Sequence, residues 1–176
     1  MKPREITIMT KLKNVDYDIL SQLIKTSRLS DRRLAKILGI SQPTVTRRRT
    51  QLEKEGVLEY TAIPDLGKLD FEIVAFTFGL WNFKAYSDTR VQAAEDFINR
   101  HPNIIFVSTG RGDFGDRVAI SVHKDYAEYS KFISDVRQEW AELMGSPTSF
   151  MISLKTDNVV RQLTFRYLID TLKGKP

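Results

Sequence analysis

Two amphipathic helical patterns with only the tripeptide 39–41 between them constrain the fold of this chain more than any other feature of its sequence. The first pattern begins after Ser30, a residue suited to capping a helix, and ends at the glycine of the tripeptide. The second begins after the serine of the tripeptide, has Pro43 in its first turn and ends at Gly56. A further amphipathic pattern at 14–28 precedes both. We therefore predict a helix-turn-helix, in which a tight turn joins the last two helices.

The residues after Gly56 extend this unit. Residues 57–63 alternate well enough to favour a short strand or wing, which Pro64-Asp65 ends. The sequence therefore predicts a winged helix-turn-helix domain over residues 1–63, followed by a linker over 64–70.

Positive charge is concentrated in this predicted domain. Residues 1–60 carry 13 Lys and Arg against 7 Asp and Glu, whereas residues 61–176 carry 14 against 15. The arginine run 47–49 costs only roughly a few tenths of a kcal/mol per repelling pair. Neutralising DNA phosphates, by contrast, supplies most of the affinity that does not depend on base sequence. We therefore predict a site for double-stranded DNA on the third helix; a merely solvated face is the alternative for an isolated arginine run.

Side chains near the start of the third helix are expected to contact DNA. Gln42, Thr44 and Thr46 suit base edges, because glutamine pairs with adenine and threonine contacts the methyl group of thymine. Arg47 and Arg48 are expected to hold phosphates, although arginine also contacts guanine often. The whole predicted DNA-binding set is Ser30, Arg32, Ser41, Gln42, Pro43, Thr44, Thr46, Arg47, Arg48 and Thr50.

Arg49 differs from its two neighbours. It lies four residues after Val45 and three before Leu52, toward the side of the helix that packs. We expect its long side chain either to reach an acidic partner or to contact DNA.

One frame of residues runs through the three predicted helices without a gap: Asp16, Ile19, Leu20, Leu23, Arg28, Ser30, Leu34, Ala35, Gly39, Ile40, Ser41, Val45, Arg48, Leu52, Glu53, Gly56 and Val57. In this frame, residues 12–60 resemble the DNA-binding domain of the Lrp/AsnC family, also called feast/famine regulators, which are bacterial and archaeal transcription factors. The sequence departs from the family at Lys13, where an acidic residue is usual, and at Arg49, where an aliphatic one is usual.

The second half of the chain predicts a different domain over residues 71–155. Strand patterns lie at 71–81, 103–110, 116–123 and 149–154, and helical patterns at 88–102 and 125–145. The apolar strand at 103–110 is expected to be buried. The order strand, helix, strand, strand, helix, strand is ferredoxin-like, and the resemblance implies the same effector-binding and oligomerisation domain. The expected fold class is therefore α+β: a winged helix-turn-helix, then a ferredoxin-like βαββαβ domain.

The glycine-rich segment 108–116 is expected to form a loop between two antiparallel strands. A plain hairpin turn explains its glycines, because glycine permits positive φ. The resemblance implies instead an effector site, with Gly110 and Asp113 in the places of the family's Gly-x-x-Asp segment. Such a site suits an amino acid bound between subunits, its residues being Gly110, Arg111, Gly112, Asp113 and Phe114. Phe114-Gly115-Asp116 is expected to lengthen the loop relative to the family.

Residues 156–176 form a C-terminal extension. The positions of Val160, Leu163, Tyr167, Leu168 and Leu172 suit one face of a helix that starts near residue 157 or 158. We expect this helix to pack on its own domain or on a partner's.

Composition limits the chemistry. The chain has no cysteine and two histidines, so we expect no thiolate chemistry, no metal, no cofactor and no catalytic residue. It has no apolar run of about 18 residues and no secretory core, which favours a cytoplasmic protein without a membrane partner.

Three classes of function remain. The first is a sequence-specific transcriptional regulator, a homodimer or a higher homo-oligomer that is modulated by a small effector such as an amino acid. The second is an enzyme: some siroheme decarboxylases are built from Lrp/AsnC-like chains, and His101, His123, Arg111 and Arg117 are the candidates here. His101 is expected to interact with a helix C-terminus, and His123 to lie at the surface. The third is a weakly specific DNA-packing protein.

Overall fold

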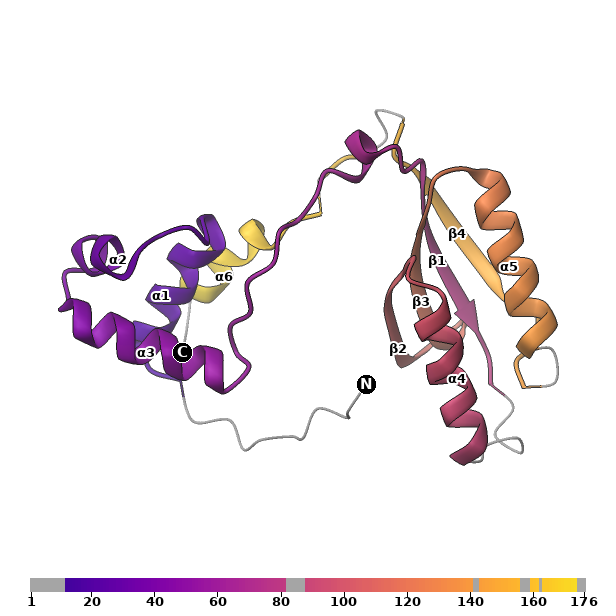
Figure 1. The fold of residues 1–176 in the computed structure, drawn as a ribbon, viewed down its shortest axis with the longest axis horizontal. Coiled ribbons are helices and arrows are strands. Elements are labelled where there is room, and N and C mark those ends of the chain that lie inside the picture. The colour runs from indigo at the N-terminus through magenta and orange to yellow at the C-terminus, as the bar shows by residue number, and fades with distance from the viewer. Residues whose placement is uncertain (1–11, 82–87, 141–142, 156–158, 162, 174–176) are drawn as a thin grey trace. The chain divides into compact units, whose positions relative to one another are not determined.

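The computed structural model describes residues 12–81, 88–140, 143–155, 159–161 and 163–173 (Figure 1). The chain divides into two compact units. The helical unit comprises Met1–Ile63 with Gln162–Pro176, and the sheet unit comprises Pro64–Arg161. No helix within the described ranges is long and apolar enough to cross a membrane.

The helical unit is built on three helices, α1 (Asn14–Lys25), α2 (Asp31–Leu38) and α3 (Gln42–Lys54). The two serines that precede α2 and α3 cap them, since each side chain accepts a hydrogen bond from the backbone N–H three residues later. Gly39 ends α2 with a φ of 67°. Ile19, Leu34, Val45 and Leu52, each at most 1% exposed, form the centre of one shared core. The helix-turn-helix is therefore fixed by its caps and by this core.

Residues 57–63 follow α3 without a regular strand of their own. The short strand that the alternating pattern favoured is thus absent from this segment. Val57 and Leu58 pack against the core of the helical unit, and both backbone N–H groups donate to Leu52 O, at 2.9 and 3.1 Å. These contacts hold the beginning of the segment against the end of α3.

The C-terminal extension returns to the helical unit, where η3 (Phe165–Leu168) leads into α6 (Ile169–Lys173) and α6 packs against α1 (Figure 1). Ile169 is the buried anchor, at 9% exposure. The expectation of one helix through residues 160–172 was wrong, because Val160 is fully exposed and the described residues before 165 are not helical. Thr164 has extended backbone and its side chain accepts from the Arg166 N–H, so the helical segment begins only there. The expected start near 157 or 158 lies outside the described residues.

The sheet unit confirms the ferredoxin-like order. Its elements are η1 (Leu66–Leu69), β1 (Ile73–Gly79), α4 (Asp88–Arg100), β2 (Ile104–Gly112), β3 (Gly115–His123), α5 (Tyr126–Trp140) and β4 (Thr148–Ser153). The strand order is β2-β3-β1-β4, and every neighbouring pair is antiparallel. The split arrangement places β1 and β3 at the centre of the sheet.

The two faces of this sheet differ. Ile73 and Ala75 face α4 and α5 and form a core with Phe97 and Trp140, among others. Because side chains alternate along a strand, the residues between them point to the opposite face. There, paired positions form a row across all four strands, Phe106–Ile120–Phe76–Phe150, which we call the open-face row.

The edge strand β2 is more exposed than its apolar sequence suggested. Ile105, Phe106 and Val107 are 52%, 50% and 41% exposed, so the expectation of a buried strand at 103–110 was wrong. The reason is its position, since β2 is paired on one side only. Within one chain, nothing among the described residues covers its outer edge.

Candidate DNA-binding site

The outward face of α3 carries five of the predicted DNA-binding residues. Gln42, Pro43, Thr46, Arg47 and Thr50 are all exposed on this helix. Arg47 makes no ion pair with any residue in the described part of the chain, so its charge is available to an anion. A helix that presents an uncompensated cation beside hydroxyl and amide groups suits a DNA groove.

Lys54 belongs to the same face and was missed from the sequence. It is exposed and follows Thr50 by four residues and Arg47 by seven, which is one helical face. The spacing was the available signal. Lys54 places a second cation at the C-terminal end of the outward face, whose N-terminal end is Gln42.

Four other predicted residues lie at helix starts, and three of them have local roles. The Ser41 hydroxyl caps α3, accepting from the Thr44 N–H at 3.4 Å, and lies 2.8 Å from the Thr44 hydroxyl. Ser30 caps α2 in the same way, accepting from Arg33 N–H at 3.3 Å. Ser30 and Ser41 remain exposed and Thr44 partly so, while Arg32 is exposed in the first turn of α2. The structure thus brings the starts of α2 and α3 together with the outward face.

The structure contradicts the prediction that Arg48 holds a phosphate. Arg48 is buried, and its guanidinium forms an ion pair with Asp16 on α1, which is fully buried. Its Nε donates to Asp16 Oδ1 at 2.6 Å, a terminal nitrogen donates to Oδ2, and Nη1 donates to Gln51 Oε1 at 2.8 Å. A guanidinium engaged in this way cannot turn to solvent without leaving a buried carboxylate unpaired. Arg48 therefore links α3 to α1.

Asp16 is adapted to this pairing. Burial alone would raise the pKa of its carboxyl, but the hydrogen bonds from Arg48 and from the Lys13 N–H, together with the Arg48 charge, lower that pKa below its ordinary value. The Lys13 bond to Asp16 Oδ2 is 2.6 Å long and satisfies a backbone donor at the start of α1. One carboxylate thus both caps α1 and anchors α3.

Arg49 takes the first of its two expected roles, since it reaches an acidic partner. Its Nη1 lies 2.9 Å from Asp31 Oδ1, and its side chain is 20% exposed. The hydrogen bond from the Thr46 hydroxyl, together with the hydrogen bond and the charge of Arg49, lowers the pKa of the Asp31 carboxyl although burial would raise it. Of the three consecutive arginines, only Arg47 remains free to meet DNA.

The predicted effector residues lie at the tip of the β2–β3 hairpin. Gly110, Arg111 and Gly112 belong to the end of β2, and Asp113-Phe114 alone form the turn, so the expected long loop was wrong. Gly115 allows this tight turn because its φ is 140° and a Cβ there would lie 2.3 Å from Gly79 O.

Other residues around this turn have structural roles. The Phe114 ring lies 5.6 Å from the Phe78 ring, although Phe114 is 68% exposed. Asp116 at the start of β3 accepts from the Trp81 N–H at 3.0 Å and so holds the chain just after β1. Asp113 stays exposed.

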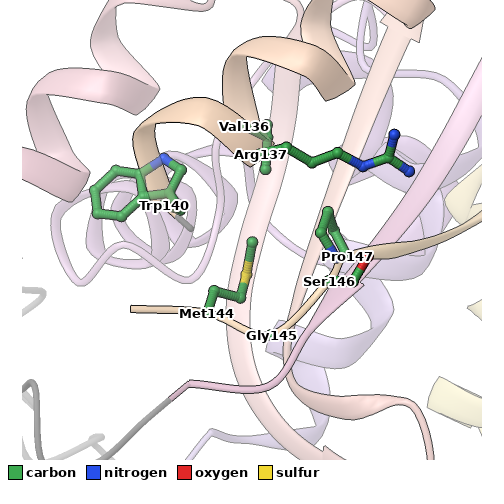
Figure 2. Close-up of a pocket in the computed structure, with 7 residues that line it drawn as sticks. All are labelled: Val136, Arg137, Trp140, Met144, Gly145, Ser146 and Pro147. Carbon is green, nitrogen blue, oxygen red and sulfur yellow. The ribbon is translucent and has the colours of Figure 1, made fainter. Parts of the chain in front are cut away.

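A separate hollow of about 230 Å³ lies beside the end of α5 (Figure 2). Figure 2 shows the Arg137 side chain extending toward Ser146 and Pro147, with Trp140 on the opposite side and Met144 between them. None of the five predicted effector residues lines this hollow, whose walls are Val136, Arg137, Trp140, Met144, Gly145, Ser146 and Pro147.

The histidines considered for catalysis both have structural partners. His101 Nδ1 lies 2.8 Å from Phe97 O in the last turn of α4, and its ring stacks on Phe97 with centroids 4.1 Å apart. His123 is fully buried, which corrects the expectation of a surface position, and its Nε2 lies 2.8 Å from Ser121 Oγ. Burial lowers the pKa of His123, which favours the neutral form of the ring. Arg117 lies over the Trp81 ring, 5.2 Å from its centroid.

Comparisons with known proteins agree with this architecture. Residues 12–59 match the family described as winged helix-turn-helix DNA-binding. An uncharacterized HTH-type transcriptional regulator of Pyrococcus abyssi is 30% identical over 132 residues, which cover 74% of this chain and 86% of the relative. The solved structure of LrpC from Bacillus subtilis has a TM-score of 0.69 and 25% identity, over 85% of this chain and 99% of that one.

A third comparison concerns the fold alone. The structure of a transcriptional regulator from Neisseria meningitidis, solved as a complex with L-Met, has a TM-score of 0.72 and 20% identity over 89% of this chain and 96% of that one. Together, the helix-turn-helix, the cationic outward face of α3 and these likenesses define a DNA-binding transcriptional regulator. The chain belongs to the Lrp/AsnC family.

Proposed function

We propose that this regulator binds a specific, near-palindromic site in double-stranded DNA as a homodimer or a higher homo-oligomer, and that a small effector modulates it. The observation that carries the proposal is the outward face of α3, where Gln42, Thr46, Arg47 and Thr50 are exposed while Arg48 and Arg49 are engaged within the protein. A DNA partner also favours the cytoplasm as its location.

The outward face divides between phosphate contact and base contact. Arg47 and Lys54 supply charge for phosphates, whereas Gln42 at the start of α3 and the Thr46 methyl group suit base edges in the major groove. The predicted contacts of Ser30, Arg32, Ser41 and Pro43 belong to the same proposal, because they lie at the starts of α2 and α3.

Substitution of Arg47 tests the DNA-binding face. In Arg47→Ala, affinity for a selected site and for random duplex should fall alike, and the slope of log K against log salt concentration should become shallower by about 0.9. Arg137→Ala, which removes an exposed arginine from the sheet unit, is the matched control. An unchanged slope in Arg47→Ala, measured by fluorescence anisotropy between 50 and 200 mM salt, would remove Arg47 from the interface.

The open-face row supports the dimer. One recognition helix covers only a few base pairs, so a specific site needs two helices about 34 Å apart along the duplex. Phe106 and Phe150 are 50% and 65% exposed at the two ends of the row, with Ile120 and Phe76 between them. A continuous apolar row on the sheet face opposite α4 and α5 suits a two-fold contact with the same face of a second copy.

Sedimentation of a charge-substituted variant tests this contact. Phe150→Glu should shift the protein toward monomer, because a carboxylate would be buried in the apolar contact. Lys131→Glu, at an exposed position on α5, is the control and should leave the mass unchanged. A Phe150→Glu variant with the mass of the unsubstituted protein would exclude the open-face row as the contact.

The effector proposal rests on the hairpin tip, where Asp113 and the neighbouring backbone suit an ammonium and a carboxylate group. The Neisseria regulator was solved with L-Met, which makes amino acids the first ligands to test here. Thermal-shift measurements with single amino acids should show stabilisation that Asp113→Ala abolishes. A response lost in Arg137→Ala instead would place the ligand in the hollow beside α5, and no response in any protein would remove the effector from the proposal.

The alternative functions receive less support. His101 and His123 are engaged in packing, which speaks against a decarboxylase site built on them. Competition with bulk genomic DNA separates a specific regulator from a packing protein, since a specific regulator retains its site by roughly 10³-fold or more.

A further inference from the structure

Arg49 lies where three segments of the helical unit meet. Its Nη1 donates to Leu29 O at 3.0 Å and to Asp31 Oδ1 at 2.9 Å, so it holds the residues on both sides of the α2 N-cap. Its Nε donates to the Tyr60 hydroxyl at 2.5 Å, which holds the segment after α3. A single guanidinium therefore connects the start of α2, the middle of α3 and the segment at 57–63.

Both charge and geometry favour this connection over contact with DNA. The Arg49 Cζ lies 4.9 Å from the centroid of the Tyr60 ring, and Glu53 Oε1 lies 3.3 Å from Nε. The side chains of Arg49 and Asp31 are only 20% and 23% exposed. A planar guanidinium with five N–H donors can serve several acceptors at fixed angles, which an ammonium group cannot do.

The same cluster includes a residue of the outward face. The Thr46 hydroxyl donates to Asp31 Oδ2 at 2.7 Å, while Arg49 occupies Asp31 Oδ1. Asp31 thus orients Thr46, and Arg49 orients Asp31. A side chain of the outward face is thus linked through Asp31 to a cation that lies outside that face.

We propose that Arg49 is a positioning residue for DNA recognition, which fixes the start of α2, the outward face of α3 and the Tyr60 segment as one rigid surface. The inference rests on the proposed function, in which that surface enters a DNA groove. Its physical basis is pre-organisation. Without Arg49, DNA must order these segments and side chains on binding, at roughly 0.5–1.5 kcal/mol for each side chain that becomes immobilised.

The proposal makes a prediction that differs from a phosphate contact. A positioning residue contributes mainly to the selected site, where base edges must be met by correctly placed side chains. We expect Arg49→Met to weaken binding to that site about tenfold, which corresponds to about 1.4 kcal/mol. Binding to random duplex should change by less than about twofold, and the salt slope should stay unchanged, because no phosphate contact is lost.

The experiment measures affinities of the full chain for a duplex selected from genomic fragments and for random duplex, between 50 and 200 mM salt. The variants are Arg49→Met, which keeps an unbranched apolar stem, and Arg49→Lys, which keeps the charge but not the planar donors. Lysine should fail to restore the specificity ratio, since the proposal assigns the effect to geometry rather than to charge. Arg47→Ala, with its shallower salt slope, is the reference for a phosphate contact.

Tyr60→Phe keeps the inference testable if Arg49→Met does not fold. This variant removes only the hydroxyl that accepts from Arg49, and we expect it to lower the specificity ratio about threefold. In the double variant Arg49→Met/Tyr60→Phe, the two effects on the specificity ratio should be less than additive, because both substitutions remove the same contact. Far-UV circular dichroism verifies that each variant is folded.

Two results would overturn the inference while leaving the proposed function intact. One is an unchanged specificity ratio in Arg49→Met and in Tyr60→Phe. The other is a salt slope in Arg49→Met that becomes shallower by about 0.9, which would assign Arg49 to a phosphate. Failure of the proposed function itself looks different, since the unsubstituted protein would then bind neither duplex or would bind both with equal affinity.

Discussion

The buried ion pair between Arg48 and Asp16 predicts a large loss of stability when one partner is removed. In Arg48→Met, the fully buried Asp16 carboxylate loses its counter-charge and two hydrogen bonds. Breaking a buried pair in this way costs about 3–5 kcal/mol, and the total stability of a domain is only about 5–15 kcal/mol. We therefore expect the helical unit of Arg48→Met to be close to unfolding at room temperature.

The two tryptophans make the assay specific to one unit. Trp81 and Trp140 are the only tryptophans of the chain, and both lie in the sheet unit. In a urea titration their fluorescence reports the sheet unit, while far-UV circular dichroism also follows α1, α2 and α3. Arg48→Met should move the dichroism transition to lower urea concentration and leave the fluorescence transition in place.

A double variant separates the charge effect from simple loss of packing. Adding Asp16→Asn to Arg48→Met removes the stranded carboxylate but retains an acceptor for the Lys13 N–H. The double variant should regain at least about 1 kcal/mol relative to Arg48→Met, because the single effects of a contacting pair do not add. A loss below about 1 kcal/mol in Arg48→Met, or strictly additive effects, would refute the reasoning.

Three further predictions concern acid, the hairpin turn and the C-terminal helix. The pKa of Asp16 is lowered from 3.8 in the folded state. The stabilisation that its carboxylate gives is therefore complete well above pH 3.8 and is lost as the pH falls through and below that value. The urea midpoint should accordingly fall less on acidification in Asp16→Asn than in the unsubstituted protein. Gly115→Ala places a Cβ against Gly79 O at a φ of 140°, which should cost about 2 kcal/mol or more and move the fluorescence transition; an unchanged midpoint would contradict this. Ile169→Ala removes the buried anchor of α6 and should lower the stability of the helical unit by about 2 kcal/mol, whereas an unaffected dichroism transition would show that α6 contributes nothing to α1.

The helix-turn-helix and the ferredoxin-like order followed from local signals. Ser30 and Ser41 determine where α2 and α3 begin, and Gly39 where α2 ends, because capping depends on neighbours within four residues. The same local logic explains the error in the C-terminal extension. There Thr164 caps the segment that follows it, and the described residues 159–161 and 163 are not helical in spite of their apolar spacing.

The role of each arginine could be predicted only in part. Val45, Arg48 and Leu52 follow helical spacing, so the spacing itself indicated that Arg48 faces the core, and its charge was given too much weight. The partner could not be found in this way, since Asp16 lies 32 residues away in the chain. For Arg49, position on α3 left two roles open, and only tertiary contact with Asp31 and Tyr60 separated them.

Local sequence patterns also could not predict which residues of the sheet unit are buried. The apolar residues of β2 resemble those of a central strand, yet the topology places β2 at an edge. The ring of His123 is buried because β3 is central and α5 packs over it with Tyr129 and Phe132. Strand order is a property of the whole domain, so exposure of single strands follows from the fold rather than from their composition.

Site-specific photocrosslinking tests the central claim, that the outward face of α3 contacts DNA, most directly. A photoreactive phenylalanine derivative is placed at Thr50, on the outward face, or at Lys131, an exposed position on α5. With a selected duplex bound, the derivative at position 50 should crosslink to DNA and that at position 131 should not. A bound complex that crosslinks at 131 and not at 50 would contradict the account.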